Sequence, residues 1–328
     1  MSKIFVTRKF PGDSLGRLME GNETEISEFD RDLSQEELIE KVKGTDAVLS
    51  LLKDRIDGDL MDIAGPQLKV ISNYAVGYDN IDVKAATDRG IVVTNTPCDE
   101  VNEAVAEHTW ALMLTLTRRI VEADEATRRG AFKGWEPDIF LGTNLIGKTL
   151  GIIGMGRIGS MVARRARGYN MTVLYNKHTP DLEAEKELGV QFATLDELLS
   201  KSDIVSLHVP LCDETRYLMN KESLAKMKKG AYLINTARGP VVREDDLVED
   251  LRSGHLGGAA LDVFENEPNI NPELIGMENV ILTPHIASAT KEARYKMAEL
   301  AVEGILSTLK GNMPTNIVNE EVWNNRRK

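Results

Sequence analysis

The sequence predicts an α/β protein built from two doubly wound parallel sheets. Runs of Val, Ile and Leu of strand length alternate with helical stretches along most of the chain, and such runs suit strands that helices cover on both faces. A glycine-rich turn in mid-chain opens the second series of runs. The length of 328 residues exceeds what one hydrophobic core usually fills, which favours two domains.

The first series leads into a long helical stretch. Its four strand-like runs lie at residues 3–7, 46–52, 68–74 and 90–95. A helical pattern with few breakers then covers residues 99–129, which predicts either one long helix or two stacked ones. This stretch either bridges the domains or pairs with its copy in a dimer. A loop rich in glycine and aromatic residues follows at 131–148.

The second series predicts the other doubly wound sheet. Its six runs lie at residues 149–154, 171–176, 202–210, 230–237, 258–264 and 279–285. The last helical stretch, 289–309, and the tail after it are expected to fold back on the first domain. The expected domains are therefore a discontinuous one, 1–99 with 289–328, and a continuous one, 100–288.

The turn that opens the second series has the GxGxxG spacing of a dinucleotide-binding motif. Gly154, Gly156 and Gly159 stand directly after an apolar strand and open a helix. They serve, in that order, the tight turn, the approach of a pyrophosphate and close packing of helix on strand. The helix N-terminus offers free N–H groups to the phosphates, and Arg157 adds a charge. A glycine-rich turn without a ligand is the alternative, which the strand–turn–helix context disfavours.

The end of the next strand bears on the choice between NAD and NADP. An acidic residue there would bond the ribose hydroxyls and repel a 2′-phosphate. The chain instead has Asn176, Lys177, His178 and Thr179, which can donate hydrogen bonds to a phosphate. We therefore expect NADP(H) to be preferred and NAD(H) to be accepted as well. The alternative is that Lys177 and His178 are solvated loop residues.

Three charged side chains stand where later strands end. Arg238 follows the run 230–237, Glu267 comes three residues after the run 258–264, and His285 is the last residue of the run 279–285. Ligands of open α/β sheets bind outside this edge. An arginine, a carboxylate and an imidazole gathered there predict a catalytic site.

With these motifs the chain resembles the D-isomer-specific 2-hydroxyacid dehydrogenase family over essentially its whole length. The resemblance includes NYAVGYDNIDV at 73–83, TNTPCDEVNEAVAEHTWALML at 94–114 and PTNIVNEEVW at 314–323. The stretch 132–159 is most similar to glyoxylate and hydroxypyruvate reductases, which often prefer NADPH. The resemblance implies a Rossmann cofactor domain and a flavodoxin-like substrate domain.

The resemblance also implies transfer of a hydride between a nicotinamide and C2 of a small 2-keto or D-2-hydroxy acid. Reduction needs an acid that ionises near neutral pH to protonate the carbonyl oxygen, and His285 is the candidate. Glu267 would bond the other imidazole nitrogen, favouring the protonated ring and fixing its orientation. Arg238 offers the fork-shaped cation that binds the substrate's carboxylate and carbonyl.

In the first domain, the resemblance places substrate contacts on two loops. The backbone N–H groups of Val76 and Gly77 are expected to bind the same carboxylate, and domain closure to exclude water. Leu51 and Leu52 would form an apolar wall that suits small substrates better than phosphorylated ones.

The remaining assignments concern the cofactor site. Asp262 either contacts the nicotinamide-side ribose or orients the site, with a structural cap as the alternative. Ala287 stands where many relatives have glycine, and we expect activity to survive this difference. His108 is expected to pack or cap in the interior. Further residues assigned to the cofactor site are Ile158, Val209, Pro210, Thr215, Thr236 and Ala237.

Composition excludes several classes of function. A net charge of −12 argues against nucleic acid, because phosphate backbones attract concentrated Lys and Arg. No apolar stretch approaches the length of a membrane span and no signal peptide is evident, so a cytoplasmic location is expected. Cys98 and Cys212 fit no metal-ligand spacing, and no metal is expected. A homodimer is expected from the resemblance and the long helical stretch.

Two other functions stay open. Within the class, D-lactate and pyruvate are the nearest alternative substrates to glyoxylate and hydroxypyruvate, since one methyl or hydroxymethyl group is worth only about 1 to 3 kcal/mol in a pocket. Outside it, a dinucleotide-sensing binding protein similar to the corepressors of this fold would bind NADPH without turnover.

Overall fold

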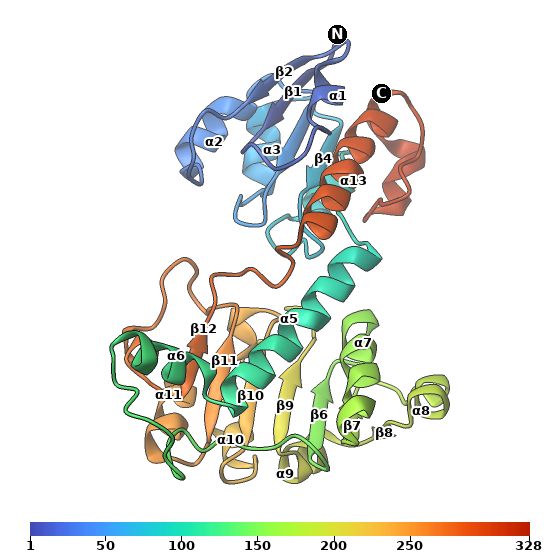
Figure 1. Ribbon diagram of the computed structural model, residues 1–328. Coiled ribbons are helices and arrows are strands. Elements are labelled where there is room, and N and C mark those ends of the chain that lie inside the picture. The colour runs from blue at the N-terminus through green and yellow to red at the C-terminus, as the bar shows by residue number, and fades with distance from the viewer. The chain divides into compact units, whose positions relative to one another are not determined.

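The computed structural model describes residues 1–328 and divides into two units (Figure 1). Unit 1 comprises Met1–Val101 and Ala289–Lys328, and unit 2 comprises Asn102–Ser288. The boundary expected between residues 99 and 100 differs from this division by two residues, within the first turn of α5 (Asp99–Thr117). Each unit contains one wholly parallel sheet with helices, which confirms the predicted fold class.

The sheet of unit 1 has the strand order β2-β1-β3-β4-β5, the flavodoxin-like arrangement. Its strands are β1 (Lys3–Val6), β2 (Glu23–Ile26), β3 (Ala47–Ser50), β4 (Val70–Asn73) and β5 (Val92–Thr94). Four of them lie within the predicted runs. The sequence prediction missed β2, because this edge strand reads ETEI and is only half buried on one face.

Helices cover both faces of this sheet. One face packs against α2 to α4, and the other packs against α13, whose Gly304 lies so close to Thr94 that a Cβ there would be 2.5 Å from the hydroxyl oxygen. The tail continues this contact, since Val318 N–H donates to the carbonyl of Val93 at 2.8 Å. The helices of unit 1 are α1 (Gly16–Met19), α2 (Gln35–Val42), α3 (Gly58–Ala64), α4 (Val83–Asp88), α13 (Lys291–Leu309) and the 3₁₀ helix η3 (Glu320–Asn325).

The sheet of unit 2 has the order β12-β11-β10-β9-β6-β7-β8. From β8 to β11 this is the six-stranded Rossmann order, with β12 added at one edge. The strands are β6 (Thr149–Ile153), β7 (Thr172–Asn176), β8 (Gln191–Phe192), β9 (Ile204–Leu207), β10 (Tyr232–Asn235), β11 (Gly258–Leu261) and β12 (Val280–Leu282). The prediction missed β8, a two-residue edge strand with both side chains exposed.

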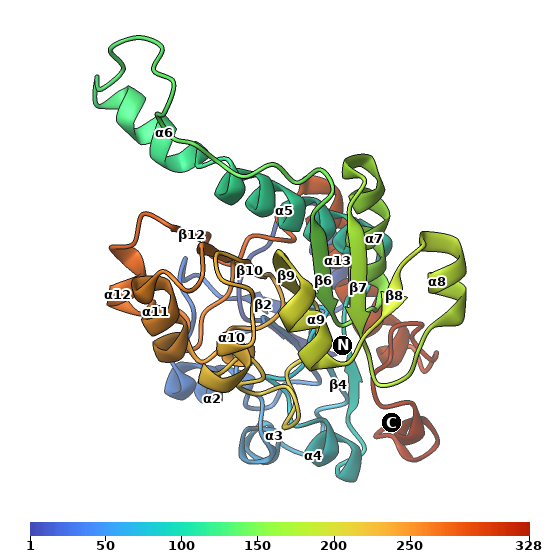
Figure 2. The same cartoon turned by 90° about the horizontal axis from the view of Figure 1, so that it is seen from below.

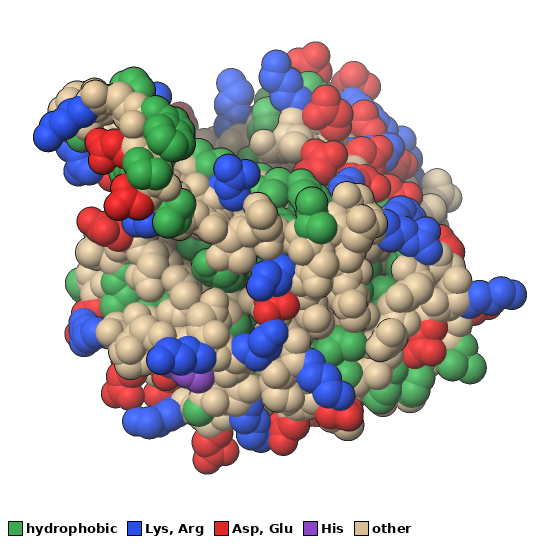
Figure 3. Space-filling model, turned by 60° about the horizontal axis from the view of Figure 1, so that its bottom comes forward, with side chains coloured by type: hydrophobic (Ala, Val, Ile, Leu, Met, Phe, Trp, Pro, Cys, Tyr) green, Lys and Arg blue, Asp and Glu red, His purple; other side chains and the backbone are tan.

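The helical stretch predicted at 99–129 is two helices. After α5, Arg119 takes a left-handed backbone with φ of 53° and α6 (Ile120–Arg128) begins. In Figure 2, α6 and the loop after it project away from the sheet of unit 2, and Figure 3 shows hydrophobic side chains on this projection. The other helices of unit 2 are α7 (Arg157–Ala166), η1 (Arg167–Tyr169), α8 (Leu182–Leu188), α9 (Leu195–Lys201), α10 (Lys221–Ala225), η2 (Gly239–Val241), α11 (Glu244–Ser253) and α12 (Pro272–Ile275).

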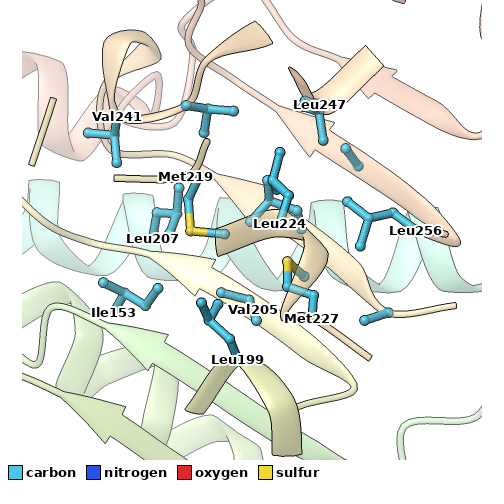
Figure 4. Close-up of a cluster of buried hydrophobic side chains, with 14 of the residues drawn as sticks. Ile153, Leu199, Val205, Leu207, Met219, Leu224, Met227, Val241, Leu247 and Leu256 are labelled. Atoms are coloured by element: carbon cyan, nitrogen blue, oxygen red, sulfur yellow. The ribbon is translucent and has the colours of Figure 1, made fainter. Parts of the chain in front are cut away.

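Two hydrophobic clusters fill the two faces of this sheet because successive strand residues point to opposite sides. Along β6, Leu150 and Ile152 join α5 and α7 in one cluster, whereas Ile153 joins α9 to α11 in the other. Figure 4 shows the second cluster, in which Leu224 and Leu247 of the helices meet strand residues. Helices on both faces leave the carboxyl ends of the strands to form the ligand-binding edge.

Candidate active site

The turn between β6 and α7 has the geometry that a bound dinucleotide requires. Gly154 has φ of 98°, and a Cβ there would lie 2.5 Å from the carbonyl oxygen of His208. A Cβ on Gly159 would overlap the carbonyl of Gly154, so only glycine lets the helix pack this closely on the strand. A Cβ on Gly156 would meet nothing within 4 Å. The backbone at Gly156 therefore faces open space that a ligand can enter.

The start of α7 supplies donors for an anion. The helix has Gly156 at its N-cap and no side-chain capping bond. The first amides of a ten-residue helix have no partner inside it, and they carry the positive end of its dipole. A pyrophosphate would satisfy these amides, and the exposed side chain of Arg157 adds a positive charge. The residues present fit a dinucleotide.

Three adjacent strands bring the predicted catalytic side chains to one edge of the sheet. β10, β11 and β12 are parallel neighbours, and Arg238, Glu267 and His285 follow them in that order. Glu267 Oε2 lies 3.0 Å from His285 Nδ1, while Glu267 Oε1 accepts from the N–H of Phe264 at 3.1 Å. The carboxylate is thereby fixed by the backbone on one side and by the imidazole on the other.

The loop that carries Arg238 packs directly on the loop that carries Glu267. A Cβ on Gly239 would overlap the carbonyl of Phe264, so the two backbones touch immediately after Arg238. Arg238 Nη1 donates to the carbonyl of Ala237 at 2.8 Å, which orients a half-buried guanidinium. A short chain of contacts therefore links Arg238, through Gly239 and Phe264, to Glu267 and His285.

Two further carboxylates, those of Glu244 and Glu265, support the same loop. The N–H of Glu265 donates to Glu244 Oε1 at 2.7 Å, and the N–H of Glu244 donates to Glu265 Oε2 at 3.1 Å. The hydroxyl of Tyr217 donates to Glu265 Oε1 at 2.6 Å. Burial raises the pKa of Glu244, although the bond from Glu265 N–H acts in the opposite direction. These bonds hold the residues just before Glu267.

Comparison with known proteins gives the family. A model described as D-isomer specific 2-hydroxyacid dehydrogenase, NAD binding domain, matches residues 110–287. The glyoxylate reductase of Pyrococcus furiosus is 48% identical over 324 residues, which cover 98% of this chain and 96% of that protein. The chain belongs to the D-isomer specific 2-hydroxyacid dehydrogenase family. The matched NAD-binding domain contains the glycine turn and all three predicted catalytic residues.

Solved structures of the family are similar to this chain over nearly its whole length. The NADPH-dependent glyoxylate/hydroxypyruvate reductase of Sinorhizobium meliloti, in complex with NADP and malonate, is 33% identical with a TM-score of 0.87, covering 100% of this chain and 99% of that chain. The apo D-lactate dehydrogenase of Escherichia coli is 30% identical with a TM-score of 0.81, covering 97% of this chain and 100% of that chain.

The segment after β7 has no acidic side chain in its first four positions, but one follows. Asn176 Nδ2 donates to the carbonyl of Ala193 at 3.0 Å, and His178 and Thr179 are exposed. Lys177 Nζ lies 3.0 Å from Asp181 Oδ2, and Asp181 Oδ1 accepts from a helix N–H. That N–H and the Lys177 ammonium lower the pKa of Asp181. Lys177 is therefore paired with a carboxylate.

Other predicted cofactor residues lie at the same edge of the sheet. Val209 Cγ1 would be 2.9 Å from a Cβ on Gly154, so the loop after β9 lines the glycine turn. In that loop, Thr215 donates to the carbonyl of Pro210 at 2.6 Å. Burial lowers the pKa of the neighbouring His208 to about 4, so this imidazole is neutral at physiological pH. The remaining residues are Ile158 in the first turn of α7, Thr236 and Ala237 after β10, and Ala287 after β12.

Asp262 is completely buried, with 0% of its surface exposed. Its Oδ1 accepts from Ile286 N–H at 2.9 Å and its Oδ2 from Ala287 N–H at 2.8 Å. This geometry is that of a residue that orients the loop after His285. A contact between Asp262 and the ribose of a cofactor stays a prediction.

In unit 1, the predicted substrate residues lie in two loops that asparagines organise. Asn95 Nδ2 donates to the carbonyl of Val76 at 2.7 Å, and Asn73 Nδ2 to that of Gly77 at 2.9 Å. No hydrogen bond within the chain uses the N–H of Val76 or Gly77. Asn80 Nδ2 bonds the carbonyl of Leu51 at 3.1 Å, beside the half-buried Leu52. The fixed carbonyls leave two amides available to an anion.

Sequence reasoning did not find several residues that organise the loops of the two units. Asn73 and Asn80 stand in the motif that carried the resemblance, but nothing in the pattern gave them a role. His108 was expected only to pack or cap, whereas its Nε2 lies 3.2 Å from Thr283 Oγ1. Gly239 follows Arg238 directly, and a glycine next to a predicted catalytic residue was the available signal for its close contact.

No group of three or more His, Cys, Asp or Glu side chains is arranged to hold a metal ion. No helix combines the length and the apolar character needed to cross a bilayer.

Proposed function

We propose that this protein reduces glyoxylate or hydroxypyruvate, reversibly, to the corresponding D-2-hydroxy acid with NADPH as the preferred cofactor. The observation that carries the proposal is the 3.0 Å pair of His285 Nδ1 and Glu267 Oε2 at the sheet edge that also presents Arg238. An imidazole held by a carboxylate beside an arginine suits protonation of a carbonyl in an anionic substrate.

The chain's residues supply binding and proton transfer. A bound nicotinamide dinucleotide supplies the hydride that adds to C2 of the keto acid. His285 gives a proton to the carbonyl oxygen, so that the C=O π bond becomes a C–H and an O–H bond, and solvent returns the proton to His285. Glu267 stabilises the imidazolium and orients it through Nδ1, which leaves Nε2 for the substrate. Arg238 binds the carboxylate and the developing negative charge on oxygen.

The proposed substrate class rests on relatives. Glyoxylate reductase is the name of the Pyrococcus furiosus relative, and glyoxylate/hydroxypyruvate reductase that of the Sinorhizobium meliloti structure. The amides of Val76 and Gly77 and the side chain of Leu52 are the substrate contacts that we propose in unit 1. Reduction of pyruvate to D-lactate is the alternative, supported by the similarity to D-lactate dehydrogenase.

The preference for NADPH rests on the segment after β7. Asn176, Lys177, His178 and Thr179 offer donors to a 2′-phosphate, and no carboxylate precedes Asp181. A phosphate would compete with Asp181 for Lys177, whose ammonium now lies 3.0 Å from that carboxylate. Because a 2′-phosphate carries more negative charge than one carboxylate, we propose that Lys177 turns to the phosphate when NADP(H) binds.

A panel of keto acids tests the proposed activity. The rate of nicotinamide oxidation is measured with glyoxylate, hydroxypyruvate and pyruvate, each with NADPH and NADH. We expect kcat/KM to be highest for glyoxylate or hydroxypyruvate with NADPH. Higher kcat/KM for pyruvate would assign a D-lactate dehydrogenase, and NADPH binding without turnover of any keto acid would favour the dinucleotide-sensing protein.

The variant Lys177→Met tests the cofactor preference. It removes the ammonium but keeps a flexible side chain of similar length, so we expect KM for NADPH to rise about tenfold, the equivalent of about 1.4 kcal/mol, with KM for NADH unchanged. Lys201→Met, which removes an exposed lysine paired with Glu197, is the matched control. An equal change of KM for NADPH and for NADH in Lys177→Met would show that Lys177 does not contact the 2′-phosphate.

A further inference from the structure

The backbone around His285 is held by one buried aspartate. His285 has φ of 55°, a left-handed conformation that non-glycine residues rarely adopt. Its N–H donates to the backbone carbonyl of Asp262 at 2.9 Å, and the next two N–H groups, of Ile286 and Ala287, donate to the carboxylate of Asp262. Three consecutive amides thus end on Asp262, which defines the direction in which His285 leaves the sheet.

A buried carboxylate can act as such an anchor only if its own charge is compensated. Burial alone would raise the pKa of Asp262, but bonds from His108, Thr283 and the two loop amides outweigh it and hold the pKa below its ordinary value. The hydroxyl of Thr283 donates to Oδ1 at 2.6 Å. His108 Nε2 lies 3.4 Å from the same oxygen. His108 and Thr283 complete the shell of donors that the loop amides begin.

His108 is the member of this network that comes from α5. Its Nε2 lies 3.2 Å from Thr283 Oγ1. Since Thr283 uses its own proton on Asp262, Nε2 must be the donor to the hydroxyl oxygen. The next residue of α5, Thr109, places its hydroxyl 2.9 Å from that of Thr236. Thr283 and Thr236 each stand two residues before a predicted catalytic side chain, His285 and Arg238.

We propose that His108 is a positioning residue of the reaction: through Thr283 and Asp262, its Nε2–H group fixes the backbone of residues 285–287 and so the direction of the His285 imidazole. The inference rests on the proposed role of His285 as proton donor. α5 packs against β10 to β12 through Met113 and Leu116, so it is a rigid support for this bond. The side chain of His108 is 19% exposed, which makes it accessible to substitution without opening the core.

Substitutions at His108 separate its hydrogen bond from its volume. His108→Leu fills the site without a donor, whereas His108→Gln can place an amide N–H near the position of Nε2. We expect His108→Leu to lower kcat for keto-acid reduction about tenfold or more and His108→Gln to restore most of it. The dissociation constant for NADPH should stay within about twofold, because His108 acts on the proton donor. Deuterated NADPH should give a larger isotope effect on kcat in His108→Leu, because the chemical step slows.

A matched control keeps the comparison specific. His255→Leu removes another half-buried histidine of unit 2, whose Nε2 bonds the carbonyl of Leu224 and which lies before β11, at the opposite end of that strand from the catalytic loop. It should change thermal stability without lowering kcat. Equal losses of kcat in His108→Leu and His108→Gln at unchanged thermal stability would overturn the proposal, since the donor would then be irrelevant.

A second variant covers the case in which His108→Leu folds poorly. Thr283→Val keeps the shape of the side chain and removes the hydroxyl that joins His108 to Asp262. It should lower kcat about as much as His108→Leu is expected to, because both changes break the same path from α5 to Asp262. A wild-type kcat in Thr283→Val would overturn the proposal. His285→Ala separates the two hypotheses. Full turnover in His285→Ala contradicts the proposed proton donor. Loss of turnover in His285→Ala, together with wild-type turnover in His108→Leu, rejects only the positioning role.

Discussion

His285 combines an unusual backbone with a specific side-chain partner. A left-handed conformation in a non-glycine residue costs on the order of 1 kcal/mol or more and persists only where surrounding bonds determine it. Here the N–H of His285 bonds the carbonyls of Asp262 and Thr283, and the ring bonds Glu267. Strain and pairing at one residue of this sheet edge support the proposal that His285 is the chemical centre of the site.

Removal of the charge on Glu267 should slow the reduction of keto acids. In Glu267→Gln the amide still contacts Nδ1 but no longer compensates the charge of a ring that donates a proton, so we expect kcat to fall about tenfold or more. Steady-state kinetics with a keto acid measure this. Glu273→Gln, a surface carboxylate paired with Arg252, should leave kcat unchanged, and a wild-type kcat in Glu267→Gln would refute the role.

Replacement of Arg238 should affect catalysis more than folding. Arg238→Gln removes the cationic fork, and we expect kcat/KM to fall about a hundredfold, the equivalent of about 2.7 kcal/mol. Arg238→Lys should recover part of this loss, because it keeps the charge but not the planar pair of donors. Steady-state kinetics and thermal denaturation provide the two readouts. A wild-type rate in Arg238→Gln would remove this side chain from the site.

At the scale of elements, β6, its turn and α7 form a unit in which the three glycines have different physical roles. Gly159 is required for packing, because any Cβ there would overlap the carbonyl of Gly154. Gly156 has no neighbour within 4 Å of a Cβ and a backbone with φ of −94° that other residues adopt readily. Folding therefore does not explain glycine at 156, and the approach of a ligand does.

Gly156→Ala should separate binding from stability. We expect the dissociation constant for NADPH to rise about tenfold or more, because a methyl group would occupy the space of the pyrophosphate, while the melting temperature stays close to that of the wild type. Gly168→Ala, also free of neighbours within 4 Å, is the control for alanine itself. Fluorescence titration and thermal denaturation test both quantities. Unaltered NADPH affinity in Gly156→Ala would argue against a dinucleotide at this turn.

At the scale of the whole molecule, the projection formed by α6 and the loop after it carries an apolar surface without a partner in the chain. Trp135 is 86% exposed, and Phe132, Leu141 and Ile146 are each at least 67% exposed. Isolated exposed apolar residues are ordinary, but several on one projecting segment favour an interface. The resemblance implies a homodimer, and we propose that this surface, Phe132 to Ile146, binds the second copy of the chain.

The oligomeric state tests this proposal directly. We expect light scattering to give the mass of a dimer for the wild type and a shift toward the monomer for the double variant Phe132→Ser, Trp135→Ser, since aromatic anchors dominate most interfaces. Ile275→Ser, a 63% exposed apolar residue elsewhere in unit 2, should leave the dimer intact. A monomeric wild type at micromolar concentration would contradict the proposal.

The sequence by itself determined the two parallel sheets and the glycine turn. Strands buried on both faces must be apolar along their length, and a turn that approaches a pyrophosphate needs glycine. Both features can therefore be recognised from residues that are adjacent in the sequence. The predicted catalytic residues, Arg238, Glu267 and His285, could be chosen because each follows such a run. The edge strands β2 and β8 were missed because they bury too little to leave an apolar pattern.

Only the tertiary structure decided how these residues are held. The break at Arg119 arises from one left-handed residue within a continuous helical pattern. His108 and Thr283 are 175 positions apart, and Thr109 and Thr236 are 127 apart, so no local pattern joins them. Hydrogen bonds of this kind depend on how a helix packs across strands, and that packing exists only after the sheet has formed. Local periodicity specifies which segments are buried, whereas folding selects the partners of the polar atoms.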